Sequence, residues 1–158
     1  MSLFFWKGKR MELNSSILAR KNKFFSNFEE GEVRVLLNEG VINRYNRGDC
    51  VFLKGDPGEA LYIILTGEVE ILLENREGLE EVLAILGPGD VFGEGSFATK
   101  SRRSAKAVAV RDTYLYAITT DHMQKLLEKS AKITAKMLLE LLKITCQRLS
   151  ITNIRLSK

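Results

Sequence analysis

The feature that most constrains the fold is a series of short apolar runs between residues 41 and 118, separated by turn sequences. Each run has the length and the β-branched or aromatic content of a strand. The runs are Val41–Tyr45, Cys50–Leu53, Leu61–Leu65, Val69–Leu73, Glu81–Leu86, Ser104–Val110 and Thr113–Ile118. Turns rich in Gly, Pro, Asn and Asp fall between them, for example at Gly55–Gly58 and Gly87–Gly89. Seven strands at this spacing predict a jelly-roll β-barrel, also called a double-stranded β-helix.

Residues 24–40 predict a helix before the barrel. Ser26 or Asn27 is a candidate N-cap, and Gly40 a candidate end. After the barrel, the pattern predicts a short helix that is capped by Asp121. The fold class is therefore expected to be mainly β, with a helix on the N-terminal side and helices on the C-terminal side.

A long C-terminal helix is expected from about Ser130 to about Leu156, because neither Gly nor Pro interrupts this segment. Small and apolar residues recur along it in alternating steps of four and three, which is a heptad seam. The seam consists of Ala131, Ala135, Leu138, Leu142, Thr145, Leu149, Thr152 and Leu156. A second stripe consists of Ile133, Met137, Leu141, Ile144 and Ile151. Two stripes predict two partners, the barrel and the same helix of a second chain, and hence a homodimer. The alternative is one wide face packed within a monomer.

These signals divide the chain into a basic N-terminal arm at residues 1–23, a barrel with flanking helices at 24–128, and the long helix at 129–158. The arm carries Phe4, Phe5 and Trp6, either as a docking tip for another subunit or as filling for a groove on its own domain. Residues 24–121 hold ten Lys and Arg against seventeen Asp and Glu, whereas both ends are basic. An acidic body with basic ends is a poor general anion binder.

One segment combines a carboxylate and a guanidinium in a pattern that predicts a binding site. Glu94 lies between Gly93 and Gly95, and Arg103 follows nine positions later beside Ser104. An ionised Glu accepts a hydrogen bond from a hydroxyl, and the Arg fork matches two phosphate oxygens. Together they suit a ligand with a sugar hydroxyl and a phosphate, and a buried Arg103 should be held by a carboxylate or carbonyl when the site is empty. The alternative is a solvated basic turn.

This segment resembles the phosphate-binding cassette of cyclic nucleotide-binding domains, a family that includes protein kinase A regulatory subunits and the bacterial catabolite activator protein. Further matching motifs lie at 52–64, 66–71 and 86–91. The resemblance implies that Glu94 binds the ribose 2′-hydroxyl, and that Arg103 and Ser104 bind the cyclic phosphate. The ligand-binding residues that it implies in the cassette are Gly93, Glu94, Gly95, Ser96, Arg103, Ser104 and Ala105.

The cassette departs from the family pattern at two positions. Gly95 replaces a bulky aliphatic residue that is expected to pack under the cassette, and Ser96 replaces an Ala. On the long helix, Thr152 and Asn153 resemble a Thr-Ser pair that contacts adenine in catabolite activators; the alternative is ordinary polar residues on a helix surface. Lys106 stands where relatives that prefer cGMP often carry Thr or Ser, which favours cAMP as the ligand, with cGMP as the second possibility.

The resemblance predicts a cyclic nucleotide sensor that couples binding to movement of the C-terminal helix. The alternative is a protein-interaction domain that keeps the fold without the ligand. Enzyme activity and a resident cofactor are not expected, because the single histidine, His122, cannot form a metal cluster or a nucleophile–histidine pair. Two cysteines, Cys50 and Cys146, suit free thiols in the cytoplasm. No apolar run approaches membrane-spanning length, so no membrane partner is expected. No DNA-binding domain is expected after the long helix.

Overall fold

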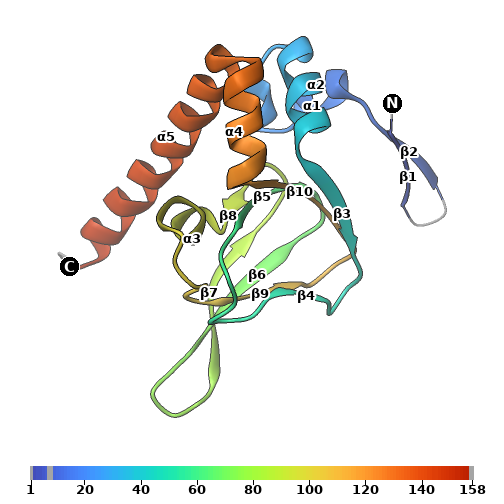
Figure 1. The fold of residues 1–158 in the computed structure, drawn as a ribbon. Coiled ribbons are helices and arrows are strands. Elements are labelled where there is room, and N and C mark those ends of the chain that lie inside the picture. Colours follow the sequence, from blue (N-terminus) through green and yellow to red (C-terminus); the bar gives the residue numbers. More distant parts are fainter. Residues whose placement is uncertain (1, 7–8, 157–158) are drawn as a thin grey trace.

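A computed structural model describes the backbone of residues 2–6 and 9–156, and the side chains of residues 14–151 and 154. Two four-stranded antiparallel sheets form the barrel (Figure 1). One sheet has the order β3-β10-β5-β8, with β3 at Val41–Tyr45, β10 at Thr113–Thr119, β5 at Ala60–Thr66 and β8 at Val91–Phe92. The other has the order β4-β9-β6-β7, with β4 at Cys50–Phe52, β9 at Lys106–Ala109, β6 at Val69–Glu74 and β7 at Glu80–Leu86. The fold class, mainly β with a jelly-roll barrel and flanking helices, is confirmed.

Each of the seven predicted runs contains a strand, and β3 has the predicted ends. The largest difference is at β9, which begins at Lys106 rather than at Ser104 because the preceding residues belong to the cassette. The two-residue strand β8 was not predicted. Side chains from both sheets, among them Ile64, Val69 and Leu115, form one apolar cluster inside the barrel.

The helix predicted at 24–40 is wrong in its first half. A 3-10 turn, η1, occupies Phe25–Asn27, and the helix α2 begins only at Glu30 and ends at Glu39, before Gly40. Neither Ser26 nor Asn27 caps α2; the N-cap is Glu29, which forms a reciprocal capping box with Glu32. The break lies at Phe28, whose extended backbone separates the two elements.

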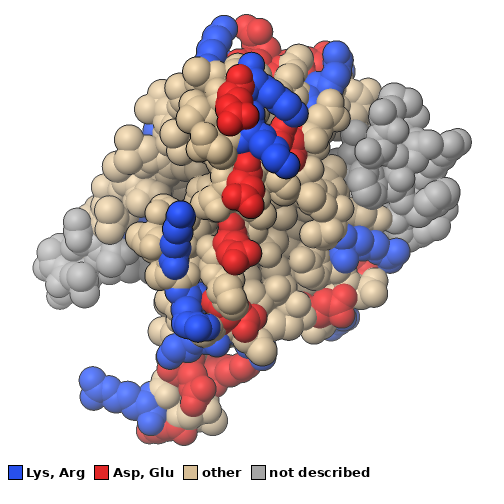
Figure 2. Space-filling view, viewed as in Figure 1, with Lys and Arg blue, Asp and Glu red and all other residues tan. Residues whose placement is uncertain are grey.

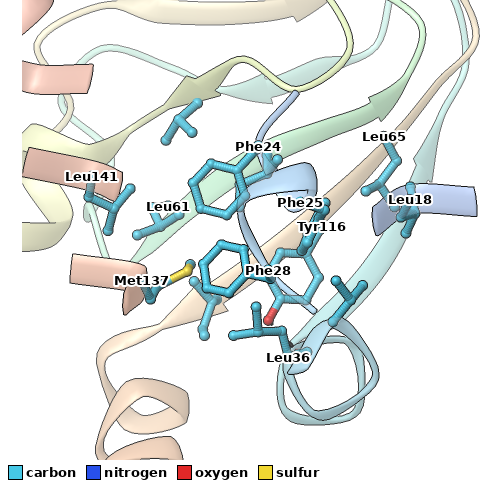
Figure 3. Packing of buried hydrophobic residues seen from close by; sticks show 14 of the residues in the cluster. Leu18, Phe24, Phe25, Phe28, Leu36, Leu61, Leu65, Tyr116, Met137 and Leu141 are labelled. Carbon is cyan, nitrogen blue, oxygen red and sulfur yellow. Dashed lines mark hydrogen bonds between the residues drawn. The ribbon is translucent and has the colours of Figure 1, made fainter. Parts of the chain in front are cut away.

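The break lies among three buried phenylalanines. Phe24, Phe25 and Phe28 are all buried, and Figure 3 shows their rings pointing into one cluster with Tyr116. Phe25 packs edge-on against the Tyr116 ring, with centroids 5.7 Å apart. A continuous helix would also place these three residues on one face, within about 100° of one another, so their burial alone does not explain the break.

The segment 1–23 contains structure that the sequence did not reveal. Strands β1, Ser2–Trp6, and β2, Lys9–Leu13, pair as an antiparallel hairpin, and the helix α1 follows at Ser15–Lys21. The Asn14 side chain caps α1 by accepting from the Ser16 backbone N–H. Figure 1 shows the hairpin standing away from the barrel, while α1 lies beside α2.

Two C-terminal helices complete the fold: α4, Thr120–Lys129, and α5, Ala131–Leu156. The N-cap of α4 is Thr119 rather than the predicted Asp121, and its hydroxyl accepts from the His122 N–H. The His122 side chain in turn accepts from the Thr119 N–H, so this histidine helps to cap the helix. Within the described residues, no helix is long and apolar enough to cross a membrane.

The two stripes of α5 have different environments. Ile133, Met137 and Leu141 are buried against the body, as predicted for the second stripe, although Ile151 of the same stripe is 52% exposed. The heptad seam faces solvent, and its leucines, Leu138, Leu142 and Leu149, are each more than half exposed. One partner of α5 is therefore its own domain, and the seam is left uncovered in the single chain.

Ion pairs join α2 to both C-terminal helices. Lys136 on α5 donates to the Glu32 carboxylate, and Lys129 on α4 donates to Glu39 over 2.6 Å. Both carboxylates are largely buried, so each needs its partner. Elsewhere on the face shown in Figure 2, Lys and Arg alternate with Asp and Glu instead of forming a patch of one sign.

We predict that Glu32→Gln lowers the free energy of unfolding by about 1–2 kcal/mol at neutral pH. Removing one partner of a fully buried ion pair costs about 3–5 kcal/mol of stability. The loss expected here is smaller, because the Lys136 side chain is 34% exposed. Burial raises the pKa of Glu32, but hydrogen bonds from Lys136 and the Glu29 backbone outweigh burial and hold the pKa below its ordinary value.

The sign of the pH dependence follows from that lowered pKa. A carboxyl of this kind stabilises the fold above its unfolded-state pKa and loses that contribution as the pH falls through its folded-state pKa. The wild type should therefore lose more stability than Glu32→Gln below about pH 5 in urea titrations. Glu30→Gln, on the exposed side of α2, is the matched control. Equal acid sensitivity of wild type and Glu32→Gln would contradict the prediction.

Candidate ligand-binding site

The cassette folds as a tight turn followed by a short helix. Gly93 has φ 77° and is the N-cap of α3, Glu94–Thr99. A Cβ atom on Gly93 would lie 2.6 Å from Nη1 of Arg103 and 3.2 Å from the Ala60 carbonyl oxygen. This position therefore requires glycine for both its left-handed backbone and its close contacts. Phe97 of α3 is buried in the main core, which fixes the helix against the barrel.

Arg103 lies just before β9 and is only 4% exposed. Its Nη1 donates to the Gly93 carbonyl over 3.0 Å and to the Ser96 hydroxyl over 2.7 Å, and its Nη2 donates to the Ala60 carbonyl over 2.5 Å. Carbonyl groups thus hold the guanidinium, as expected from its burial. Its backbone is also fixed, because the Arg103 N–H donates to the Asp56 carbonyl over 2.8 Å.

One donor of this guanidinium is left without a partner. The Nε–H of Arg103 is buried and makes no hydrogen bond. The guanidinium carbon lies 4.2 Å from the centre of the Phe52 ring, which holds its plane in place. Burial lowers the pKa of Arg103, while Tyr62, Asp56 and Glu94 oppose that shift, and an arginine keeps its charge at neutral pH even so. A fixed cation with an unused donor is suited to bind an anion.

Arg103 and Glu94 share one cavity of about 330 Å³. All seven residues that the resemblance implies in the cassette line it: Gly93, Glu94, Gly95, Ser96, Arg103, Ser104 and Ala105. The opposite wall is apolar and comes from both sheets, with Phe52, Ile71, Leu83, Leu86 and Phe92. The cavity combines an apolar wall with a few converging polar groups, which is the usual character of a small-ligand site.

Arg148 on α5 is a site residue that the sequence analysis did not identify. It donates through Nη1 to Oε1 of Glu94 and through Nη2 to the Val91 carbonyl, and it lines the same cavity. One signal pointed to it. Arg148 lies four residues before Thr152, and this spacing places both on the same face of a helix.

Two residues near the cassette need separate comment. A Cβ atom on Gly95 would meet nothing within 4 Å, so a side chain there would begin in open space rather than under the cassette. Lys106 pairs with Glu80 over 2.9 Å and is not among the residues that line the cavity, and its bearing on the choice between cAMP and cGMP stays a prediction. Thr152 and Asn153 lie in α5, but their side chains are outside the described part, and their contact with a base stays a prediction.

A larger cavity, of about 510 Å³, lies beyond the far end of α3, but its charges oppose one another. Lys100 and Arg102 line it together with Glu59 and Asp121. No buried unpaired donor marks this cavity among the described residues, so size alone does not make it the site. In the same part of the chain, no cluster of His, Cys, Asp and Glu could hold a metal ion.

Comparison with known proteins identifies the family of the chain. The family model for the cyclic nucleotide-binding domain matches residues 42–130, which is more than half of the chain. The cyclic AMP receptor protein of Thermus thermophilus is 42% identical over 55% of this chain and 40% of its own length. A CRP-like cAMP-activated global transcriptional regulator of Mycobacterium tuberculosis is 31% identical over 87% of this chain and 59% of its own length. The chain thus spans less than two thirds of either relative.

A comparison with solved structures leads to the same family. A cyclic nucleotide-binding domain from Methylobacillus flagellatus superposes with a TM-score of 0.76 at 30% identity, covering 87% of this chain and 78% of that one. The matched family segment contains the whole cassette, from Gly93 to Ala105. The chain belongs to the cyclic nucleotide-binding domain family.

Proposed function

We propose that this chain is a non-catalytic sensor of the cytoplasm that binds cAMP, with cGMP as the weaker ligand, and couples binding to the position of α5. The observation that carries the proposal is that Arg103, whose buried Nε–H has no partner, lines one cavity together with Glu94. Two relatives named for cyclic AMP support the choice of nucleotide.

The proposed roles use the geometry of the site. The cyclic phosphate takes the free donor of Arg103, with the hydroxyl of Ser104 beside it. The ribose 2′-hydroxyl donates to Glu94. A carboxylate has two oxygens, so Glu94 can accept the ribose hydroxyl on Oε2 while Oε1 stays bonded to Arg148. The purine then lies toward the apolar wall, and its contact with Thr152 and Asn153 stays a prediction.

Arg148 supplies the proposed coupling. It is the contact by which the distal half of α5 reaches Glu94 and Val91. A nucleotide bound to Glu94 adds a further bond to the same carboxylate and fixes its orientation toward Arg148. Binding therefore favours the α5 position that keeps this contact, by as much as the nucleotide prefers that position over any other.

The exposed seam of α5 supports a homodimer. Leu138, Leu142 and Leu149 recur at heptad spacing and are unburied in the single chain. The edge strand β7 adds exposed apolar residues at Leu83 and Ile85, and Leu83 also lines the cavity. Pairing two α5 helices along this seam would remove the exposed leucines from water.

We predict that Arg103→Leu strongly weakens nucleotide binding in calorimetry. Loss of a buried charge-assisted pair costs about 2–5 kcal/mol, which weakens binding by a factor of about 30 to several thousand. Arg102→Leu is the matched control, because Arg102 is exposed and donates to the Gly55 carbonyl outside the cavity. Thermal melting verifies that both variants are folded.

The wild type should bind cAMP more tightly than cGMP in the same titration. If the wild type gives no heat with either nucleotide, the sensor is excluded, and the alternative of a protein-interaction domain with this fold remains.

We predict that Arg148→Gln separates binding from coupling. Glu94 and Arg103 remain, so cAMP should still bind, weakened by about tenfold through the loss of one charged neighbour. Hydrogen exchange of residues 142–151 should slow on cAMP addition in the wild type and stay unchanged in the variant. Lys143→Gln, on the same helix and paired with its neighbour Glu140 over 3.0 Å, is the control. Equal slowing in wild type and Arg148→Gln would refute the coupling role.

We predict that Leu142→Glu turns a dimer into a monomer in sedimentation equilibrium. A charge in the centre of a coiled-coil seam is desolvated without a partner, which disfavours association. Leu139→Glu makes the same change at a residue that is 53% exposed but lies off the seam, and it should stay dimeric. A monomeric wild type would exclude this interface.

A further inference from the structure

The hydroxyl of Ser104 is accessible and unused at the edge of the nucleotide cavity. Ser104 lies in a bend between Arg103 and β9, is exposed, and lines the cavity of about 330 Å³. Its hydroxyl has no hydrogen-bond partner among the described residues. The other serine of this cavity, Ser96, is half-buried and already accepts a hydrogen bond from Arg103. Ser104 is therefore the cavity serine that is open to an enzyme from solution.

Basic residues flank Ser104 in the sequence. Lys100 and Arg102 precede it and are both exposed, whereas Lys106 follows it and pairs with Glu80 over 2.9 Å. Exposed cations beside a reactive hydroxyl are complementary to a partner with acidic side chains around its own active site. The flanking charges therefore suit a serine kinase that selects basic substrates.

Arg103 offers a binding place for a phosphate attached to Ser104. Its side chain is 4% exposed, and its buried Nε–H has no partner. The two residues are adjacent in the chain, and both line the cavity. A phosphoserine carries about −1.5 to −2 charges at neutral pH and three strong acceptor oxygens. A guanidinium with an unused donor is a favourable partner for such a group.

We propose that Ser104 is a phosphorylation site, and that its phosphate takes the place of the cyclic phosphate and excludes the nucleotide. The inference rests on the proposed function of this cavity. In the reaction, Oγ of Ser104 attacks the γ-phosphorus of a nucleoside triphosphate that a serine kinase supplies. The Oγ–P bond forms, the bond from the γ-phosphorus to the bridging oxygen breaks, and the nucleoside diphosphate leaves with that electron pair. The hydroxyl proton passes to a base of the kinase.

The phosphate on Ser104 and a bound nucleotide compete for the same donor of Arg103. Each should therefore disfavour the other, as linkage between two ligands of one site requires. General repulsion between two anions would have a similar direction, so the test needs a phosphate in the same basic segment but outside the cavity. Ser101 meets this need, because it is exposed and lines the separate cavity of about 510 Å³.

The first experiment tests the modification itself. The full chain is incubated with ATP and a purified serine kinase that prefers basic residues before its target, and mass spectrometry locates the phosphate. We expect phosphate on Ser104, and Ser104→Ala should lose that modification. Saturating cAMP should slow the modification of Ser104 by at least about tenfold, because the nucleotide fills the cavity. A wild type that carries no phosphate on Ser104 would overturn the proposal.

The second experiment measures nucleotide binding by calorimetry on a chain made with phosphoserine at position 104. Its affinity for cAMP should be at least about 100-fold lower than that of the unmodified chain, since the charged donor of Arg103 is no longer available. The control carries phosphoserine at position 101 and should bind within about threefold of the unmodified chain, because salt screens exposed charges. Unchanged affinity with phosphate at 104, or equal weakening by phosphate at 101, contradicts the proposal.

A readout without nucleotide separates failure of this inference from failure of the proposed function. In ³¹P NMR titrations, the second pKa of phosphoserine at position 104 should lie below its ordinary value of about 6, because the Arg103 guanidinium favours the dianion. It should also lie below the pKa of phosphoserine at position 101. An unmodified chain that binds no cAMP refutes the proposed function, whereas equal pKa values at the two positions refute the contact with Arg103.

Discussion

The burial of one guanidinium governs the arrangement of the site. Taking Arg103 out of water is costly unless its donors find acceptors, and three parts of the chain supply them. The Gly93 carbonyl, the Ser96 hydroxyl and the Ala60 carbonyl come from the turn before α3, from α3 itself and from the start of β5. Because these groups converge on one side chain, the cassette and the barrel have a fixed relative position before any ligand arrives, and the cost of ordering the site falls on folding rather than on binding.

The barrel and the cassette were predictable because their signals are local. Turn glycines with positive φ, such as Gly55 and Gly89, mark the strand ends directly in the sequence. The pairing of Glu94 with Arg103 in one cavity was predictable because the chemistry of a sugar hydroxyl and a phosphate requires those two groups. In both cases the types of residue in the segment are enough to predict the feature, the strand ends in the first and the two binding groups in the second.

The features that were missed depend on contacts between distant parts of the chain. Arg148 reaches Glu94 across 54 positions of sequence, and its spacing from Thr152 is the one local signal that pointed to it. The break before α2 lies among three phenylalanines that pack with distant residues such as Tyr116, and the local helical pattern does not reveal those contacts. The N-cap of α4 is Thr119 instead of Asp121, a difference of two residues. Helix propensities alone do not locate a helix end to within two residues.

Burial along α5 is unequal. Its first half is anchored by Met137 and Leu141 in the core and by the ion pair of Lys136, whereas its second half is bonded to the body through Arg148 and leaves Leu149 and Ile151 more than half exposed. From Ile144 to Leu156 the helix rises about 18 Å at about 1.5 Å per residue. A tilt of this segment by about 10° at Ile144 would displace Leu156 by about 3 Å. A small change in the angle of the helix is therefore magnified at its far end.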